Sequence, residues 1–359
     1  MPTVGKRHKK VLSLQSRLPS HVHLMPAPAI SCTNMTKKKL LVGIDIGGTK
    51  TAVLVSSAPP AVLGRIEFPT RPENGPEPAI GLIKKAVRGL VGRRSAGYAN
   101  QAIGAIGVSC GGPLDHIRGV IQAPPNLSSW VDVPIKTILQ DEFSAECHVE
   151  NDANAGAVAE HRFGAGKGCR NMVFITMGTG FGAGIITDGH LYHGTNDMAG
   201  EIGHVRLTRS GPVGYYKAGS VEGWISGGGI AQVAARMVAA AEKKKEVTIL
   251  TEVAHQGLPI TARDVALAAQ KGDALAARVI LSTARRLGGV LAILVDILNP
   301  ERIVIGGLAM RLGDALLAPA REVIRREALA TPAAACEVIP AALGESIGDV
   351  AALCVAMGL

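Results

Sequence analysis

One arrangement occurs twice in this chain and restricts its fold more than any other feature. In residues 40–55 and again in residues 172–186, an apolar run leads into a turn of glycine and threonine, and a second apolar run follows. The turns are Gly47-Gly-Thr49 and Gly178-Thr-Gly180. Apolar runs on both sides of a short glycine turn are typical of two strands joined by that turn. Because the two units lie about one domain length apart, the sequence predicts an internally duplicated α/β fold.

Other segments show strand and helix patterns. Strands are expected at residues 105–109, 147–149 and 302–305, and helices at residues 77–90, 155–160, 228–244, 261–271, 273–298 and 347–357. Two of these strands end in glycine-rich or polar turns, Cys110-Gly-Gly-Pro113 and Glu150-Asn-Asp152. The carboxyl ends of strands are where α/β folds carry their chemistry. We therefore expect a functional site at these turns.

The glycine turns differ from the common nucleotide-binding loops. The chain contains no G-x-x-x-x-G-K-[ST] sequence, so neither turn is a Walker A loop. Residues 178–183 match G-x-G-x-x-[GA], but a dinucleotide site needs a helix directly after this pattern. Residues 184–187 form a β-type run instead, which argues against the Rossmann interpretation.

Glycine hairpins can still bind phosphate. Without Cβ atoms their N–H groups approach phosphate oxygens closely, and Thr49 and Thr179 can add hydroxyl donors. Asp45, at the end of the first strand, could hold Mg²⁺ or its water shell. An ordinary tight hairpin is the better interpretation of one unit alone. Two units with threonine in both turns, and Asp45 beside one of them, favour phosphate binding.

Asn151 and Asp152 place an amide beside a carboxylate at a strand end. An amide can orient a hydroxyl group, and a carboxylate can accept its proton during phosphoryl transfer. The alternative is that Asp152 caps the Ala-rich helix that follows. The two roles can coexist, because a base at the start of a helix is held rigidly.

Glu201, His204 and Glu222 form a third group of polar residues, in Gly200-Glu-Ile-Gly-His204 and Ser220-Val-Glu-Gly223. Carboxylates with an imidazole suit a ligand that carries many hydroxyl groups. Taken alone, a Glu-x-x-His sequence is more often a surface pair or a core histidine.

The positive charge of the chain is concentrated at its start. The formal charge is +9, and residues 1–39 contain eight lysines or arginines and no acidic residue, so the remainder carries only +1. Residues 1–38 could be a transit peptide, a disordered arm, or a stretch before a mis-assigned start. We favour the last, because Met35-Thr-Lys-Lys-Lys39 leads straight into the first strand. No basic stripe with interleaved aromatic residues follows, so a nucleic acid is not an expected partner.

Apolar runs and cysteines restrict the class of protein further. No apolar run reaches the roughly 18 residues that a membrane-spanning helix needs, so no membrane partner is expected. The six cysteines are scattered without a C-x-x-C pair. This spacing favours neither a disulfide framework nor a cysteine metal cluster, and it fits a reducing cytosol.

Taken together, these segments resemble the ROK family of sugar kinases and sugar-responsive repressors. The resemblance extends from about residue 39 to the C-terminus. It rests on Asp45-Ile-Gly-Gly-Thr-Lys50, Glu150-Asn-Asp-Ala-Asn-Ala155, Gly178-Thr-Gly-Phe-Gly182, Asp188-Gly-His-Leu-Tyr192, Ala199-Gly-Glu-Ile-Gly-His204 and Ile305-Gly-Gly307. It implies the actin-like ATPase (ribonuclease H-like) fold, an α/β fold of two related domains with an interdomain cleft. We expect an N-terminal domain at residues 39–155, a C-terminal domain at residues 156–344, and a last helix within residues 345–359 that could pack back on the N-terminal domain.

The resemblance also implies roles for the residues above. Asp152 would be the general base, and the sugar hydroxyls would contact Asn151, Glu201, His204, Glu222 and, through the Pro125–Trp130 segment, Asn126. ATP would contact Asp45, Gly47, Gly48, Thr49, Lys50, Gly178, Thr179 and Gly180, with Gly306 and Gly307 against the adenosine. The implied protein is a cytoplasmic homodimer that uses Mg²⁺ with ATP to phosphorylate a hexose, glucose at O6 first. An N-acylhexosamine, fructose or another hexose remains an alternative acceptor.

One departure from the family pattern concerns metal. Family members usually carry a structural zinc site of one histidine and three cysteines, and the three cysteine positions here hold Val213, Tyr215 and Ser220. A closed zinc site needs four ligands, so we expect no structural zinc and a loop held by packing, through Tyr215, Tyr216 and Trp224. A regulator of the same family is the alternative from another class. Such regulators carry a winged-helix domain in front, which we do not expect residues 1–38 to form.

Overall fold

The computed structural model describes residues 39–92 and 101–358. Its first sheet has the order β3-β2-β1-β4-β7. The strands are β1 (Leu40–Ile46), β2 (Lys50–Ser56), β3 (Gly64–Pro69), β4 (Ile103–Cys110) and β7 (Glu146–Asn151). Strands β1, β2 and β3 pair antiparallel, whereas β4 and β7 continue parallel to β1. Asp45 is therefore opposite Ser109, and Cys110 is opposite Asn151, so three carboxyl ends meet at one edge of the sheet.

The second sheet repeats this plan. Its order is β10-β9-β8-β13-β14, and its strands are β8 (Met172–Met177), β9 (Phe181–Thr187), β10 (His190–Leu191), β13 (Arg302–Gly307) and β14 (Glu337–Pro340). Again three strands pair antiparallel and two continue in parallel. The equivalent glycine turns, β1–β2 and β8–β9, sit at equivalent places in the two sheets. The expected duplicated α/β architecture is confirmed.

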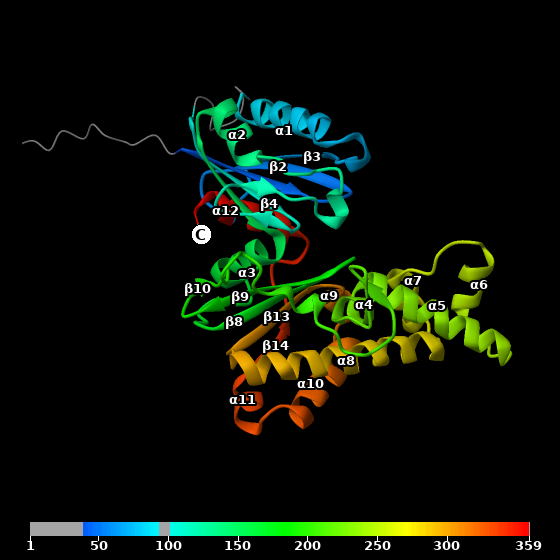
Figure 1. The fold of residues 1–359 in the computed structure, drawn as a ribbon. Helices are drawn as coiled ribbons and strands as arrows, with labels where there is room; N and C mark the ends of the chain where they lie inside the picture. The colour runs from blue at the N-terminus through cyan, green and yellow to red at the C-terminus, as the bar shows by residue number, and fades with distance from the viewer. Residues whose placement is uncertain (1–38, 93–100, 359) are drawn as a thin grey trace, which may run out of the picture. The chain divides into compact units, whose positions relative to one another are not determined.

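Helices cover both faces of the first sheet (Figure 1). Helices α1 (Pro76–Val91) and α2 (Ile135–Phe143) lie over one face, and α12 (Ile347–Ala356) lies against β1 and β4 on the other. The buried residues of α1 recur every three or four positions, as expected of a helix with one apolar face: Ala79, Ile80, Ile83, Ala86, Val87 and Leu90. The two helices predicted here, at residues 77–90 and 347–357, are confirmed, and each of their ends differs from the prediction by at most one residue.

The second sheet is also enclosed by helices. Helix α3 (Asp152–Phe163) packs on β8 and β9 and against α12, while α5 (Gly227–Lys243), α8 (Ala274–Leu298) and α10 (Asp314–Glu327) share the core on the opposite face. The remaining helices are α4 (Val221–Ile225), α6 (Ile249–His255), α7 (Ala262–Gln270), α9 (Leu308–Leu312) and α11 (Ala330–Ala335). Helix α8 ends at Asn299, which adopts the left-handed conformation that commonly closes a helix.

Glycines let α12 approach the first sheet unusually closely. A Cβ atom at Gly107 would lie 2.1 Å from the backbone nitrogen of Ala356, and one at Gly43 would lie 3.2 Å from the Ala352 Cβ atom. A Cβ atom at Gly107 would overlap the backbone of α12, so glycine is needed there for α12 to be seated directly on β4, and Gly43 allows a close approach to β1. This brings the start of α12, a segment about 300 residues later in the chain, to the carboxyl end of β1.

Two expectations concern other parts of the chain. The tail, residues 1–38, lies outside the described residues, so its three interpretations remain predictions. In residues 39–92 and 101–358, the structure contains no helix with the length and apolar character needed to cross a membrane.

Candidate functional site

The end of β7 and the start of α3 present Asn151 and Asp152 on a rigid backbone. Asn151 is the N-cap of α3, since its Oδ1 accepts a hydrogen bond from the Ala153 N–H at 2.9 Å. Asp152 is the first residue of the helix, and its Oδ1 accepts from the same N–H at 2.8 Å. The alternative that Asp152 is the cap is therefore wrong. An amide at the capping position satisfies the helix and leaves the carboxylate oriented by the first turn.

Asn126 joins the first glycine turn to the neighbouring strand ends. It lies in the short 3₁₀ helix Pro125–Leu127. A Cβ atom at Gly48 would lie 2.8 Å from the Asn126 Cβ atom, and one at Gly111 would lie 3.3 Å from Asn126 Oδ1. One at Gly112 would lie 2.8 Å from Asn151 Nδ2. The two glycines after β4 therefore leave room for both amides, a role that the sequence pattern hinted at but did not assign.

The second glycine turn is surrounded by backbone from two other elements. Within the turn, Gly178 N–H donates to the Gly180 carbonyl at 3.1 Å. The Gly227 N–H, at the start of α5, donates to the Gly178 carbonyl at 2.8 Å. A Cβ atom at Gly307, whose φ is +68°, would lie 2.2 Å from the Met177 carbonyl oxygen. The predicted residues Gly306 and Gly307 thus lie beside the turn. The helix itself was predicted at residues 228–244, but the contact of its first residues, Gly227-Gly-Gly229, with this turn was not.

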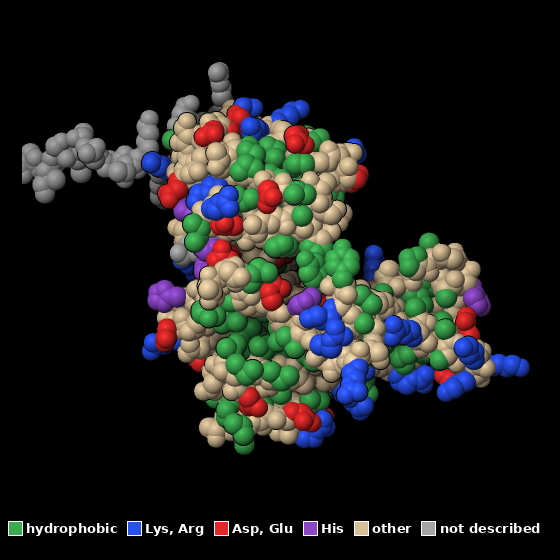
Figure 2. All heavy atoms as spheres, in the orientation of Figure 1, with side chains coloured by type: hydrophobic (Ala, Val, Ile, Leu, Met, Phe, Trp, Pro, Cys, Tyr) green, Lys and Arg blue, Asp and Glu red, His purple; other side chains and the backbone are tan. Residues whose placement is uncertain are grey.

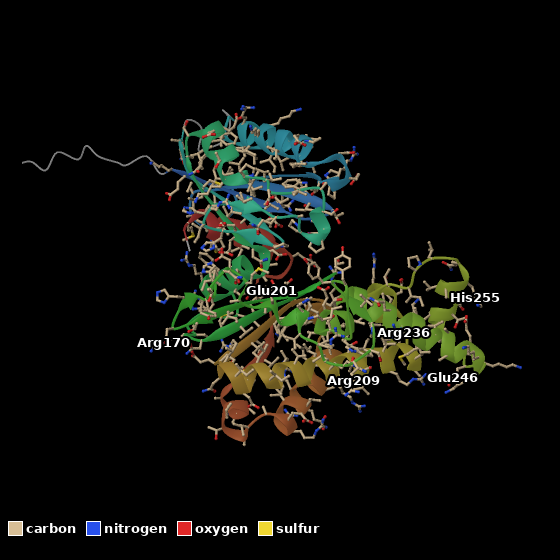
Figure 3. The ribbon with its side chains drawn as sticks, viewed as in Figure 1. Arg170, Glu201, Arg209, Arg236, Glu246 and His255 are labelled. Carbon is tan, nitrogen blue, oxygen red and sulfur yellow. The ribbon has the colours of Figure 1, made fainter. Side chains whose placement is uncertain are left out.

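Glu222 and Glu201 approach the same region from the second half of the chain. The Phe181 N–H, directly after the second turn, donates to Glu222 Oε2 at 3.1 Å. A Cβ atom at Gly180 would lie 2.9 Å from that oxygen. Glu201 begins the 3₁₀ helix Glu201–His204 and lies between the two sheets in Figure 3. The two predicted carboxylates are therefore brought to one place.

The electrostatics of the site are dominated by carboxylates. Burial, followed by the charges of Asp152 and Asp349, raises the pKa of Asp45 to about 6 against the opposing effects of Lys50 and Arg65. Asp152 keeps a surface open to solvent, but the protein around it displaces bulk water, and this desolvation raises its pKa. Desolvation, followed by the charges of Asp152 and Glu222, raises the pKa of Glu201. Figure 2 shows acidic side chains beside the hollow between the layers that contain the two sheets. Such a cluster favours cations and hydroxyl-rich ligands.

Two predicted residues have other contacts. The Lys50 ammonium lies 3.0 Å from Glu67 Oε2 at the surface, where the pair is exposed. His204 is exposed, and its ring meets the Tyr215 ring edge-on with centroids 5.7 Å apart. The His204 carbonyl accepts a hydrogen bond from Lys217 Nζ. Among the described residues, neither side chain forms a hydrogen bond or ion pair with Asp152, so their roles remain predictions.

Threonine backbones tie the glycine turns to their surroundings. The Thr49 carbonyl accepts from the Thr70 N–H at 3.1 Å, and the Thr70 hydroxyl donates to the Gly47 carbonyl at 2.6 Å. In the second turn, the Thr179 carbonyl accepts from the Gly228 N–H at 3.4 Å. Both turns are therefore held through their backbones, which leaves the hydroxyl groups of Thr49 and Thr179 without an intramolecular bond among the described residues.

The loop at the family's zinc position does not fit a metal. Val213 is tied through its backbone to Gln232, whose Oε1 accepts from the Val213 N–H at 2.9 Å. The Ser220 hydroxyl caps α4 by accepting from the Gly223 N–H at 3.1 Å. No group of three or more histidine, cysteine or acidic side chains suitable for a metal occurs in the part of the chain that the structure describes. Hydrogen bonds therefore perform the bracing that the metal would provide.

Of the three aromatic residues expected to hold this loop by packing, two do so and the third does not. Trp224 Nε1 donates to the Thr208 hydroxyl at 2.7 Å, and the Arg286 guanidinium lies 3.7 Å over its ring. Tyr215 packs on His204 as described, whereas Tyr216 is 92% exposed. Trp224 and Tyr215 thus act as expected, and Tyr216 adds little packing.

Comparisons with known proteins agree with this geometry. The pattern of the ROK family matches residues 41–358. A glucokinase of Halalkalibacterium halodurans is 35% identical over 311 residues, which cover 86% of this chain and 92% of that protein. A xylose repressor of Caldicellulosiruptor bescii is 30% identical over 68% of this chain and 59% of its own. The crystal structure of a ROK family glucokinase from Streptomyces griseus in complex with glucose and AMPPNP is 30% identical, covers 89% of this chain and 99% of its own, and superposes with a TM-score of 0.73. The chain therefore belongs to the ROK family.

Proposed function

We propose that this protein is an ATP-dependent sugar kinase that transfers the γ-phosphoryl group of ATP to O6 of glucose. The observation that carries the proposal is the position of Asp152 within one carboxylate cluster that includes Asp45 beside one glycine turn and Glu222 beside the other. A proton acceptor thus lies near two phosphate-binding turns. Relatives named glucokinase, one solved with glucose and AMPPNP, support glucose as the acceptor.

In the proposed reaction, Asp152 accepts the proton of the sugar hydroxyl as its oxygen bonds to the γ-phosphorus. The bond from that phosphorus to the bridging oxygen of the β-phosphate breaks, and ADP leaves. Desolvation raises the pKa of Asp152, and a carboxylate with a raised pKa is a stronger base than an ordinary one. Asn151 and Asn126 would orient the hydroxyl group, since both amides face the space beside Gly48, Gly111 and Gly112.

The nucleotide would lie between the two glycine turns. Backbone N–H groups of Gly47, Gly48, Gly178 and Gly180, with the hydroxyls of Thr49 and Thr179, would hold the β- and γ-phosphates. Gly306 and Gly307, beside the second turn, would contact the adenosine. Asp45 suits Mg²⁺, a hard cation that prefers oxygen ligands. When bound, the metal would neutralise charge on the transferring group.

Glu201, Glu222 and His204 would bind further sugar hydroxyls, and they would decide the preferred hexose. An N-acylhexosamine or fructose remains an alternative acceptor, because a hydroxyl-binding site discriminates through each hydrogen bond that a wrong sugar leaves unmade.

A panel of hexoses in a coupled ADP-release assay tests the proposal. We expect glucose to have the highest kcat/KM, ahead of mannose, fructose, N-acetylglucosamine and N-acetylmannosamine. If another sugar leads, the kinase assignment stands and the acceptor is wrong. If no sugar supports ADP release above the rate with water, the kinase assignment is wrong.

A sugar-responsive regulator is the second candidate, favoured by the xylose repressor among the relatives. Binding of glucose in calorimetry without any ATP turnover would support it. Asp45, Thr49 and Asp152 favour catalysis, because a regulator has no use for a base beside two phosphate turns.

A cytoplasmic homodimer completes the proposal. The described cysteines, Cys110, Cys147, Cys169, Cys336 and Cys354, are unpaired thiols, in keeping with a reducing compartment. Sedimentation equilibrium should give twice the chain mass of 37.1 kDa; a single-chain mass would contradict the dimer.

A further inference from the structure

Two histidines and two carboxylates form a chain of contacts behind the catalytic strand end. His193 Nε2 donates to Glu150 Oε2 at 2.8 Å. The rings of His193 and His116 stack with centroids 4.2 Å apart and planes 10° from parallel. His116 Nδ1 lies 2.6 Å from Asp197 Oδ2 without the geometry of a hydrogen bond, and the His116 backbone N–H donates to the same oxygen at 3.3 Å. We call Glu150, His193, His116 and Asp197 the histidine link.

The link is shielded from solvent. The side chain of Glu150 is only 2% exposed, and those of Asp197, His193 and His116 are 16%, 24% and 27% exposed. Electrostatic interactions in such surroundings are screened less than surface pairs. The hydrogen bond that His193 donates to Glu150, larger in effect than desolvation, raises the pKa of His193.

Each end of the link leads to a residue of the proposed sugar site. Glu150 Oε1 accepts from the Asn151 N–H at 2.8 Å and from Asn154 Nδ2 at 3.0 Å, so it is bonded to the backbone of the residue beside Asp152. His193 and Asp197 lie in the segment that connects β10 to Glu201. Within that segment, the Ala199 N–H donates to the His193 carbonyl at 3.1 Å. His116 follows β5 (Leu114–Asp115) and so belongs to a third segment.

We infer that the histidine link positions the Glu201 segment against the Asp152 strand end, and that His193 and His116 thereby set the affinity for the sugar. The two imidazoles are positioning residues, because they have no contact with Asp152 and act through Glu150 and Asp197. Among the described residues, the segment 192–200 is otherwise tied to β9 only near the two ends of the segment. At one end the Tyr192 N–H donates to the Ile185 carbonyl, and at the other Gly200 packs against the backbone of Ala183. Without the link, Glu201 would keep its hydrogen-bonding groups and lose its fixed distance from Asp152.

The inference rests on the proposed function and predicts a specific kinetic pattern. In His193→Leu the glucose KM should rise roughly tenfold, since small displacements of positioning groups are costly. The ATP KM should stay unchanged, because both glycine turns are held by other contacts. His193→Gln should recover most of the affinity, because its amide N–H can donate to Glu150. His116→Leu should resemble His193→Leu, and the double variant should be no worse than either, as expected for two parts of one link.

His190→Leu is the matched control. His190 is an exposed histidine three residues before His193, and among the described residues the hydrogen-bond partner of its ring is the Asp188 carbonyl. This variant should keep the KM values of the unchanged protein for both substrates.

Hydrogen–deuterium exchange separates this inference from the kinase assignment, because it needs no activity. Amides of residues 194–200 should exchange faster in His193→Leu and His116→Leu than in the unchanged protein or in His190→Leu. Unaltered exchange together with an unaltered glucose KM would overturn the inference. The inference would also be overturned if both KM values and the melting temperature changed together and His193→Gln did not restore the affinity for glucose. That result would show a merely structural role for the histidines.

Discussion

Gly348 abuts the carboxylate of Asp45: a Cβ atom at residue 348 would lie 2.5 Å from Asp45 Oδ2. The two residues are about 300 positions apart in sequence and meet because α12 is seated on β1. The neighbouring Asp349 is held by Arg65 of β3, whose Nε lies 2.8 Å from Asp349 Oδ2. The first turn of α12 is therefore part of the wall around the proposed metal ligand.

Gly348→Ala should displace the Asp45 carboxylate and lower activity. We expect kcat to fall at least about tenfold, because a misplaced metal ligand weakens charge stabilisation in the transition state. Gly81→Ala in α1 is the matched control, since a Cβ atom there meets nothing within 4 Å. That control should keep full activity and gain about 0.5 kcal/mol in the free energy of unfolding. Equal activity of the two variants in the coupled assay would count against a role for Asp45.

Asp152→Asn should abolish turnover without weakening the fold. Asparagine cannot accept the hydroxyl proton, so kcat should fall by at least ~10². Its Oδ1 can still accept from the Ala153 N–H. A carboxyl whose pKa is raised on folding costs stability above that raised pKa, and the cost is absent below the unfolded value of 3.8. At neutral pH the variant should therefore melt no lower than the unchanged protein, and calorimetry should show retained glucose binding. Near-normal turnover would show that another group is the base.

The acid limb of the pH–rate profile should lie above the ordinary range of an aspartate. Because desolvation raises the pKa of Asp152, the protonated, inactive form persists to higher pH than the ordinary aspartate pKa of 3.8 implies. Saturating MgATP should hold Asp45 ionised, since a nearby cation lowers a carboxyl pKa, so the limb of kcat reports Asp152. Circular dichroism at each pH controls for unfolding. A rate that stays flat down to about pH 4 would contradict the raised pKa.

Zinc should be absent from the folded protein and unnecessary for it. Metal analysis after purification without added zinc should give well below one equivalent, and a chelator should leave the melting temperature and activity unchanged. The reason is that Val213 and Ser220 are engaged in hydrogen bonds with Gln232 and Gly223, and neither offers a ligand that zinc prefers. One equivalent of zinc in the purified protein, with a large fall in melting temperature when a chelator is added, would show that the prediction is wrong.

Ser220→Ala tests the replacement for the metal directly. The variant removes the cap of α4, and such a loss typically costs about 1 kcal/mol. Because Glu222 lies in the first turn of α4, we also expect a higher glucose KM. Ser210→Ala is a suitable control, since its backbone carbonyl, not its hydroxyl, is the group bonded to Thr208. Thermal denaturation measures the stability of both variants, and glucose titration measures their KM. Equal results for the two variants would contradict a bracing role for Ser220.

The sequence was sufficient wherever local pattern and local chemistry coincide. Glycine with threonine between two apolar runs specifies a tight turn, so both glycine turns and the repeat of the fold could be predicted. The same holds for the helices with regular apolar spacing, such as α1 and α8. Other segments were missed for different reasons. Strands β3 and β14 are short, whereas α2 has apolar residues at helical spacing, Ile135, Ile138, Leu139 and Phe143, so its pattern was present in the sequence but was not used.

Only the tertiary structure decided which distant residues meet. Asn126 reaches Gly48 and Gly111, Gly348 reaches Asp45, and His193 stacks on His116 across intervals of the chain that no local pattern spans. Such contacts depend on how whole layers pack, for example on the absence of a Cβ atom at Gly107 that lets α12 sit on β4. A residue's type states what chemistry it can perform, whereas its partner is set by packing that involves the whole fold.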